Sequence, residues 1–206
     1  MRLTVFGATG TVGRPLVQQA LDAGHEVTAF TRDAAKVTTR HERLTVVEGD
    51  VTDPGSVLPA VEGADAVVVT LGAGRHGVVR ETGTRAVITA MHRAGVRRLV
   101  VQSTLGVGDS RANLNFLWKR VMFGLLLRQA YADHVRQEEA VRESGLDWTI
   151  VRPSAFTDQP VPGVRHGFGT DTEGLRLKVS RADVAAFLLA EAERAEHLHR
   201  AVALSA

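Results

Sequence analysis

Three glycines spaced three residues apart, Gly7, Gly10 and Gly13, separate a short β-branched and aromatic run from an amphipathic stretch. This order predicts a strand, a tight glycine turn and a helix. Gly7 lets the chain leave the strand sharply, Gly10 lets the backbone approach a pyrophosphate, and Gly13 lets helix and strand pack closely. The helix N-terminus would offer N–H groups and partial positive charge to phosphate. Incidental glycines in an ordinary turn are the alternative, but the flanking strand and helix favour a dinucleotide site.

The end of the second expected strand, near residue 31, is the position that discriminates between dinucleotides. An Asp or Glu there binds the ribose hydroxyl of NAD, whereas an Arg accommodates the 2′-phosphate of NADP. In this chain Thr31 is followed by Arg32 and Asp33, with Lys36 one helical turn later. Arg32 and Lys36 therefore favour NADP(H), and a solvated surface arginine is the alternative interpretation.

Two further strand ends carry residues suited to holding the same ligand. Asp50 and Val51 follow an expected strand over residues 44–48. The Asp can accept a hydrogen bond from the adenine amino group while the Val packs on the ring, although a turn-initiating Asp is equally expected. Leu71 and Gly72 end the next strand, where glycine would let the backbone pass close to the cofactor.

A hydroxyl at the end of the fifth expected strand is the candidate for catalysis. Ser103 and Thr104 lie there, beside the place that a nicotinamide or a hydride acceptor would occupy. A capping or turn role for the Ser103 hydroxyl is the alternative. Pro153 and the residues after it, including Phe156, follow the sixth strand and could hold the carboxamide.

The usual acid–base pair of short-chain dehydrogenases is missing. Those enzymes use a Tyr with a Lys four residues later, which lowers the Tyr pKa for proton transfer. The single tyrosine is Tyr131, and Val135 stands four residues on, so we expect Tyr131 to serve packing. We expect His134 at the surface. No carboxylate cluster joins His197 and His199 in sequence, so we expect no metal site.

The elements that must position these residues alternate regularly. Strands are expected over residues 3–6, 26–31, 44–48, 64–71, 98–103 and 148–151. Helices are expected between them, over residues 12–23, 54–62, 78–94 and 132–144. A glycine of the kind that ends helices in the left-handed conformation follows each helix, at Gly24, Gly63, Gly95 and Gly145. Continuously apolar strands such as 66–69 fit a parallel sheet covered on both faces. The sequence therefore predicts an α/β fold with a doubly wound (Rossmann) parallel sheet.

The C-terminal part is less regular. Residues 154–174, rich in Gly, Pro, Thr and Asp, are predicted to form a long loop of the kind that binds ligands. Ser180 is predicted to cap a helix over residues 181–193, before a short strand over 201–204. Residues 114–127 read as a helix that is apolar on two sides. They are too short to span a membrane, and either belong to the core or form a pocket wall, a lid or a subunit contact.

Composition narrows the class of protein. A chain of 206 residues is expected to be one domain, residues 1–206. The net charge of +2 and the lack of a long basic run argue against nucleic acid as a partner, and the absence of cysteine excludes disulfides, thiolate metal sites and a Cys nucleophile. A strand that begins almost at residue 1 leaves no room for a signal peptide, so we expect a cytoplasmic protein without membrane attachment. The oligomeric state stays open.

Several short segments add a more specific signal, and they are Phe6-Gly7-Ala8-Thr9-Gly10, Thr31-Arg32-Asp33, Gly49-Asp50-Val51, Asp133-His134, Arg142-Glu143-Ser144-Gly145-Leu146 and Asp158-Gln159-Pro160. With them the chain resembles the biliverdin-IXβ reductases, also called NADPH flavin reductases. More broadly it is similar to atypical short-chain dehydrogenases with NmrA-like NAD(P)-binding domains. The resemblance runs over nearly the whole chain. It departs at Ala155, where those reductases carry a His two residues after the matching Pro.

The resemblance implies cofactor contacts at a set of strand ends. They are Thr9, Gly10, Thr11, Val12, Arg32, Lys36, Asp50, Val51, Leu71, Gly72, Ser103 and the loop that starts at Pro153. It implies an NADPH-dependent reductase that passes hydride to a flat small-molecule acceptor such as a flavin or quinone, a reaction that needs little side-chain acid–base help. A nicotinamide-nucleotide sensor of the NmrA-like type, which binds cofactor without turnover, is the alternative.

Overall fold

The computed structural model describes residues 1–72, 79–113, 127–167, 173 and 175–206. Its main sheet has the strand order β3-β2-β1-β4-β5-β6-β10-β8. The strands are β1 (Arg2–Phe6), β2 (Glu26–Thr31), β3 (Leu44–Glu48), β4 (Ala66–Val69), β5 (Arg98–Gln102), β6 (Asp147–Pro153), β8 (Arg165–His166) and β10 (Arg200–Ser205). All neighbouring pairs are parallel except β8 with β10. The predicted doubly wound α/β fold is confirmed.

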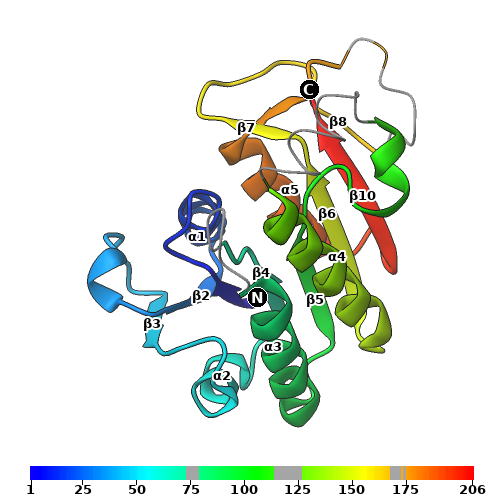
Figure 1. Ribbon diagram of the computed structural model, residues 1–206. Coiled ribbons are helices and arrows are strands. Elements are labelled where there is room, and N and C mark those ends of the chain that lie inside the picture. Colours follow the sequence, from blue (N-terminus) through cyan, green and yellow to red (C-terminus); the bar gives the residue numbers. More distant parts are fainter. Residues whose placement is uncertain (73–78, 114–126, 168–172, 174) are drawn as a thin grey trace.

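Helices cover both faces of this sheet (Figure 1). The helices are α1 (Gly13–Asp22), α2 (Pro54–Val61), α3 (Arg80–Ala94), α4 (Arg128–Glu143) and α5 (Arg181–Arg194). Helices α1 and α5 pack together on one face, and α2, α3 and α4 form a row on the other. Strand β4 is buried along its whole length, as its continuously apolar sequence predicts.

The turns that end the helices follow their sequence signals. Gly24, Gly63, Gly95 and Gly145 all have positive φ, between 66° and 88°, as predicted. The Ser180 side chain accepts a hydrogen bond from the Asp183 N–H, and so caps α5.

The long loop predicted over residues 154–174 is only partly correct. Strand β7 (Ala155–Thr157) pairs in parallel with β9 (Lys178–Ser180) to form a separate two-stranded sheet, and β8 adds an edge to the main sheet. Three- and two-residue strands are too short to show a period of their own, which is why the sequence pattern missed them. The predicted apolar helix over 114–127 lies outside the described residues except for Leu127. No described helix has the length and hydropathy needed to cross a bilayer.

Candidate functional site

A cavity of about 540 Å³ runs along the carboxyl edge of the main sheet. Strands β1 to β6 are parallel, so their carboxyl ends meet at this edge, and the residues that follow them line the cavity. Of the predicted site residues, Gly13 alone does not line it, and the other fourteen do: Gly7, Thr9, Gly10, Thr11, Val12, Arg32, Lys36, Asp50, Val51, Leu71, Gly72, Ser103, Pro153 and Phe156. The structure thus gathers predicted site residues from Gly7 to Phe156 into one space.

The glycine turn after β1 is built as its spacing predicts. Gly7 has φ of +86°, and a Cβ on it would lie 2.6 Å from the Thr70 carbonyl oxygen. A Cβ on Gly13 would lie only 2.1 Å from the Gly7 carbonyl oxygen, so Gly13 is the point where α1 and the turn pack closely. Gly10 is different, because the nearest atom to its Cβ would be 3.1 Å away. The third glycine is therefore needed by the fold, while the second leaves open backbone toward the cavity.

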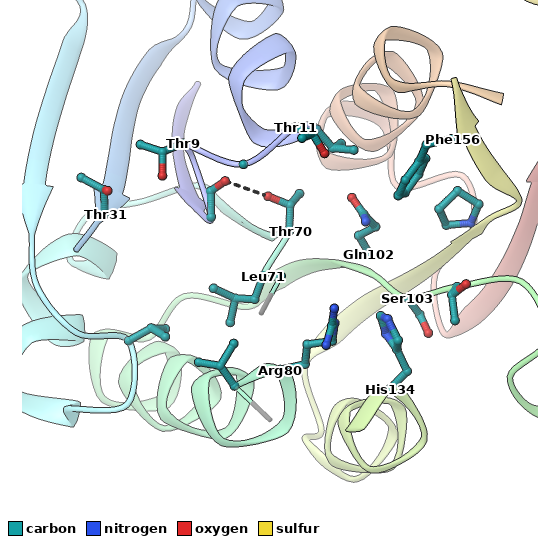
Figure 2. Close-up of a pocket in the computed structure, with 18 of the residues that line it drawn as sticks. Thr9, Thr11, Thr31, Thr70, Leu71, Arg80, Gln102, Ser103, His134 and Phe156 are labelled. Atoms are coloured by element: carbon teal, nitrogen blue, oxygen red, sulfur yellow. Dashed lines mark hydrogen bonds between the residues drawn. The ribbon is translucent and has the colours of Figure 1, made fainter. Parts of the chain in front are cut away.

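The N-terminus of α1 completes a phosphate-binding geometry. Val12 is its N-cap residue, and no side chain caps the helix. The first N–H groups of a helix lack partners within it, and with the helix dipole they attract an anion. Thr9 and Thr11 lie on either side of this turn in Figure 2. The Thr70 hydroxyl, from the end of β4, donates to the Phe6 carbonyl oxygen at 3.1 Å and so ties the turn to the sheet.

At the end of β2 one acidic side chain lies beside two basic ones. The Asp33 carboxylate accepts the Ala35 N–H and forms an ion pair with Lys36 at 3.2 Å, so it is engaged within its own turn. Arg32 is exposed and lines the cavity. This end of the cavity therefore presents Arg32 and Lys36 to a ligand.

In the structure Asp50 initiates a turn, which is one of the two roles predicted for it. Its carboxylate accepts the Thr52 N–H at 2.8 Å and the Thr52 hydroxyl at 2.7 Å. These hydrogen bonds, the backbone one first, hold the pKa of Asp50 below its usual range. Asp50 also lines the cavity beside the buried Val51. Gly83 of α3 was not predicted: a Cβ on it would lie 2.8 Å from Leu71 and 2.9 Å from Val51, so the missing side chain makes room for both.

Buried hydroxyls mark the opposite end of the cavity. Ser103 is 2% exposed and Ser154 is 8% exposed. The Ser154 hydroxyl has no hydrogen-bond partner among the described residues, while the Ser103 hydroxyl lies close enough to the Glu138 carboxylate to help lower its pKa. A buried polar group without a partner costs free energy, which a bound ligand would offset. Phe156 of β7 stands near them with its ring 38% exposed and the Arg181 guanidinium 5.4 Å above it. Figure 2 shows Phe156 facing the same space as Gln102 and Ser103.

Two basic side chains at this end were not predicted as site residues. Arg80, the first residue of α3, and His134 of α4 both line the cavity and lie side by side next to Ser103 (Figure 2). The predicted surface position of His134 is therefore wrong. Burial and the neighbouring Arg80 charge lower the pKa of His134 to about 4, so its imidazole is neutral near pH 7. Asp133 and Gln137, four residues apart on the same helix, are buried as well, so this face of α4 is polar and covered.

Tyr131 does not belong to the cavity lining. Its hydroxyl donates to the Gly106 carbonyl oxygen at 3.2 Å. The side chain thus fixes the loop after β5 to α4, which agrees with the packing role expected from Val135 at the Lys position.

A buried ion pair stands behind the Ser103 end. The Arg152 guanidinium of β6 donates from Nε and Nη2 to the two Glu138 oxygens, at 2.9 and 2.7 Å, and also bonds Asp109. Burial opposes the charge of Glu138, but Arg152 and Arg142 hold its pKa below the usual range. The pair ties α4 to β6, the two elements that carry His134 and Pro153.

The histidine cluster near the C-terminus is closer to carboxylates than its sequence suggests. His197 Nδ1 lies 2.6 Å from the Glu191 carboxylate, and ligand atoms of Glu191, Glu196 and His197 all lie within 4.8 Å of one another. The fold thus brings to His197 a carboxylate from α5 that the spacing in the sequence did not indicate. Glu191 also pairs with the buried Arg98, at 3.6 Å, which gives its charge a structural role.

Comparison with known proteins adds an independent line of evidence. The NAD(P)H-binding family matches residues 7–195. A "(4-alkanoyl-5-oxo-2,5-dihydrofuran-3-yl)methyl phosphate reductase" of Streptomyces griseus is 32% identical over 166 residues, which cover 79% of this chain and 52% of that protein. The photosystem II assembly factor Ycf39 of Synechocystis is 36% identical over 115 residues, covering 53% of this chain and 35% of that protein. The chain thus spans about half, or less, of these two relatives.

A solved structure matches over nearly its full length. ChuY, described as an anaerobillin reductase from Escherichia coli, superposes with a TM-score of 0.82 and 27% identity, covering 99% of this chain and 96% of that one. The matched fold is the one built above from the strand order.

Proposed function

As the chain belongs to the NAD(P)H-binding family, we propose that it is an NADPH-dependent reductase that delivers hydride to a flat acceptor such as a flavin or quinone. The observation that carries this proposal is the single continuous cavity. It runs from Arg32 and Lys36, past the glycine turn, to Ser103 and the exposed ring of Phe156. A dinucleotide laid along it would bring its nicotinamide to the end where an acceptor can stack.

The preference for NADPH follows from the charges after β2. The 2′-phosphate needs cations, and Arg32 and Lys36 offer them at the cavity edge. The Asp33 carboxylate, which could otherwise bind ribose hydroxyls, is already engaged by Ala35 and Lys36.

The residues present fit a nicotinamide dinucleotide. The uncapped N-terminus of α1 suits the pyrophosphate, and the buried hydroxyls of Ser103 and Ser154 suit polar groups at the nicotinamide end. The bound dinucleotide supplies the hydride, and the protein holds donor and acceptor in reacting position.

A flat acceptor fits the shape and chemistry of the far end. Phe156 offers an exposed aromatic face, and flat rings stack favourably on such faces. Tyr131 lies outside the cavity lining, and His134 is neutral near pH 7, so neither is a ready proton donor. Flavins and quinones suit this site because solvent can protonate the reduced ring. Two relatives whose names contain "reductase" support the reaction type.

The test is a screen of NADPH oxidation against flavins, quinones and simple ketones. We expect turnover with at least one flavin or quinone and none with the ketones. A Phe156→Ala variant should raise KM for the flat acceptor several-fold. Turnover of ketones at comparable rates would show that a strong acid operates at the site, and would refute the proposal.

A sensor without turnover is the second candidate. The similarity to Ycf39, named as an assembly factor, favours a role in binding a protein partner. Such a protein would bind NADPH tightly and oxidise it with none of the acceptors in the screen, so the same experiment separates the two functions.

A further inference from the structure

Arg80 is a cation in an unusual position. It is the first residue of α3, and it is 8% exposed. It lies beside His134 and Ser103 (Figure 2), at the end of the cavity that we call the acceptor end. Arginine is rarely buried to this extent unless its charge is matched. The question is therefore what matches it.

The carboxylate of Asp133 matches Arg80 only in part. The distance from Arg80 Nη1 to Asp133 Oδ2 is 3.4 Å, which is long for a charge-assisted hydrogen bond. The same carboxylate accepts the backbone N–H groups of Arg80 and Glu81, both at 3.1 Å, at the start of α3. Asp133 is thus shared between the guanidinium and the positive end of a helix. Arg80 Nε, which is buried, has no hydrogen-bond partner among the described residues.

No other described charge at this end offsets the guanidinium. Asp33 and Asp50 are the only carboxylates among the described lining residues, and both lie with Arg32 at the opposite end. His134 is neutral near pH 7 and adds no charge of its own. Glu138, one turn further along α4, is occupied by Arg152 and Arg142. The acceptor end therefore carries a buried guanidinium that is only loosely paired and that keeps an unused hydrogen-bond donor.

We propose that Arg80 is a catalytic residue whose guanidinium binds the acceptor oxygen on which negative charge develops during hydride transfer. This inference rests on the proposed reductase function. In that step the C–H bond of the dihydronicotinamide breaks, its two electrons and hydrogen pass to the acceptor, and the nicotinamide becomes oxidised. A quinone acceptor that has received the hydride is left as a hydroquinone anion, which takes one proton from water. A preorganised cation in a site with little water stabilises such an anion more than the neutral ground state.

The first test measures binding without turnover, on protein saturated with NADP⁺. Its probes are the hydroxynaphthoquinone lawsone, an anion at neutral pH that resembles the charged product, and naphthoquinone, its neutral counterpart. We expect the wild type to bind the anion at least about 10-fold more tightly, as one charge-assisted hydrogen bond provides. Arg80→Gln should abolish this preference, and Arg80→Lys should keep part of it. The matched control is Arg85→Gln, on the same helix, whose side chain is 53% exposed and paired with Glu81.

The second test measures turnover of a neutral quinone. Arg80→Gln should lower kcat by roughly 10²-fold, the usual effect of removing one such donor, while NADPH affinity stays unchanged. An unchanged anion preference in Arg80→Gln, or an unchanged kcat, would overturn the role of Arg80. If Arg80→Gln does not fold, Arg80→Lys is the test, because this variant keeps the positive charge. Complete loss of the anion preference in Arg80→Lys would also overturn the role of Arg80. Failure of the wild type to oxidise NADPH would refute the reductase function, while the binding comparison decides on Arg80 by itself.

Discussion

At the scale of single residues, we expect Arg32 and Lys36 to decide which dinucleotide binds. Charge-assisted hydrogen bonds to the 2′-phosphate contribute about 1.5–3 kcal/mol each, so NADPH should bind at least about 10-fold more tightly than NADH. Arg32→Ala should reduce that ratio mainly by weakening NADPH. Calorimetric titration of both nucleotides measures it, and equal affinity of the wild type for the two would contradict the assignment.

Replacement of Tyr131 tests whether a protein side chain acts as a general acid in the reaction. Its hydroxyl donates to the Gly106 carbonyl oxygen and lies outside the described cavity lining. Tyr131→Phe should therefore keep most quinone or flavin reductase activity, and Ser103→Ala should lower it only modestly. General acid catalysis contributes roughly 10²–10⁴-fold, so a loss of that size in Tyr131→Phe, with folding and NADPH binding intact, would mean that the hydride-only mechanism is wrong.

The candidate site was predicted well where its residues follow strands, and poorly where they come from helices. Ser103, Asp50 and Arg32 could be found because parallel strands end at one edge of the sheet. Arg80 and His134 reach the same cavity from two different helices, and helix packing decides whether such side chains meet. A single sequence contains no direct signal of that packing.

At the scale of elements, the glycine turn should separate binding from folding. A Cβ on Gly10 would lie 3.1 Å from its nearest neighbour, a contact that a small shift relieves, whereas a Cβ on Gly13 would lie 2.1 Å from a carbonyl oxygen. Gly10→Ala should thus fold with a small loss of stability and lose most NADPH affinity, because the backbone of this turn is expected to approach the pyrophosphate closely. Gly13→Ala should lower the thermal midpoint itself. Circular dichroism melts and nucleotide titration check both, and normal NADPH binding by Gly10→Ala would mean that the turn serves structure alone.

The same scale shows why most of the fold was predictable. Strands β1 to β6 and the five helices carry apolar patterns long enough to identify, and glycines after the first four helices mark where these end. The sheet of β7 and β9 has no such pattern, because its register depends on pairing between segments more than twenty residues apart. That small sheet carries Phe156, so this part of the site depends on the least predictable element.

At the scale of the whole molecule, His134 couples stability to pH. Its pKa is about 4 in the folded protein and 6.5 in a free side chain, so the unfolded chain binds the extra proton first. The free energy of unfolding should therefore fall as the pH drops from 6.5 to 4, by about 3 kcal/mol in total from this group. When the pH falls below the usual pKa of a Glu side chain, Glu138 adds to this loss of stability, because its pKa is lowered in the folded protein.

Urea unfolding at a series of pH values measures this effect, with His134→Gln as the comparison. The variant should show a shallower decline between pH 6.5 and 4 than the wild type. Identical slopes for the two proteins would show that His134 titrates normally in the fold.

The central claim, hydride transfer from NADPH to a flat acceptor, is tested most directly by a single-turnover experiment without oxygen. The protein, in excess over NADPH, is mixed with a quinone, and the absorbance of NADPH is followed in parallel for NADPH deuterated at the transferred position. We predict loss of one NADPH for each quinone reduced, slowed several-fold by the deuterium. Tight binding of NADPH without oxidation by any flavin or quinone would contradict the claim and favour the sensor.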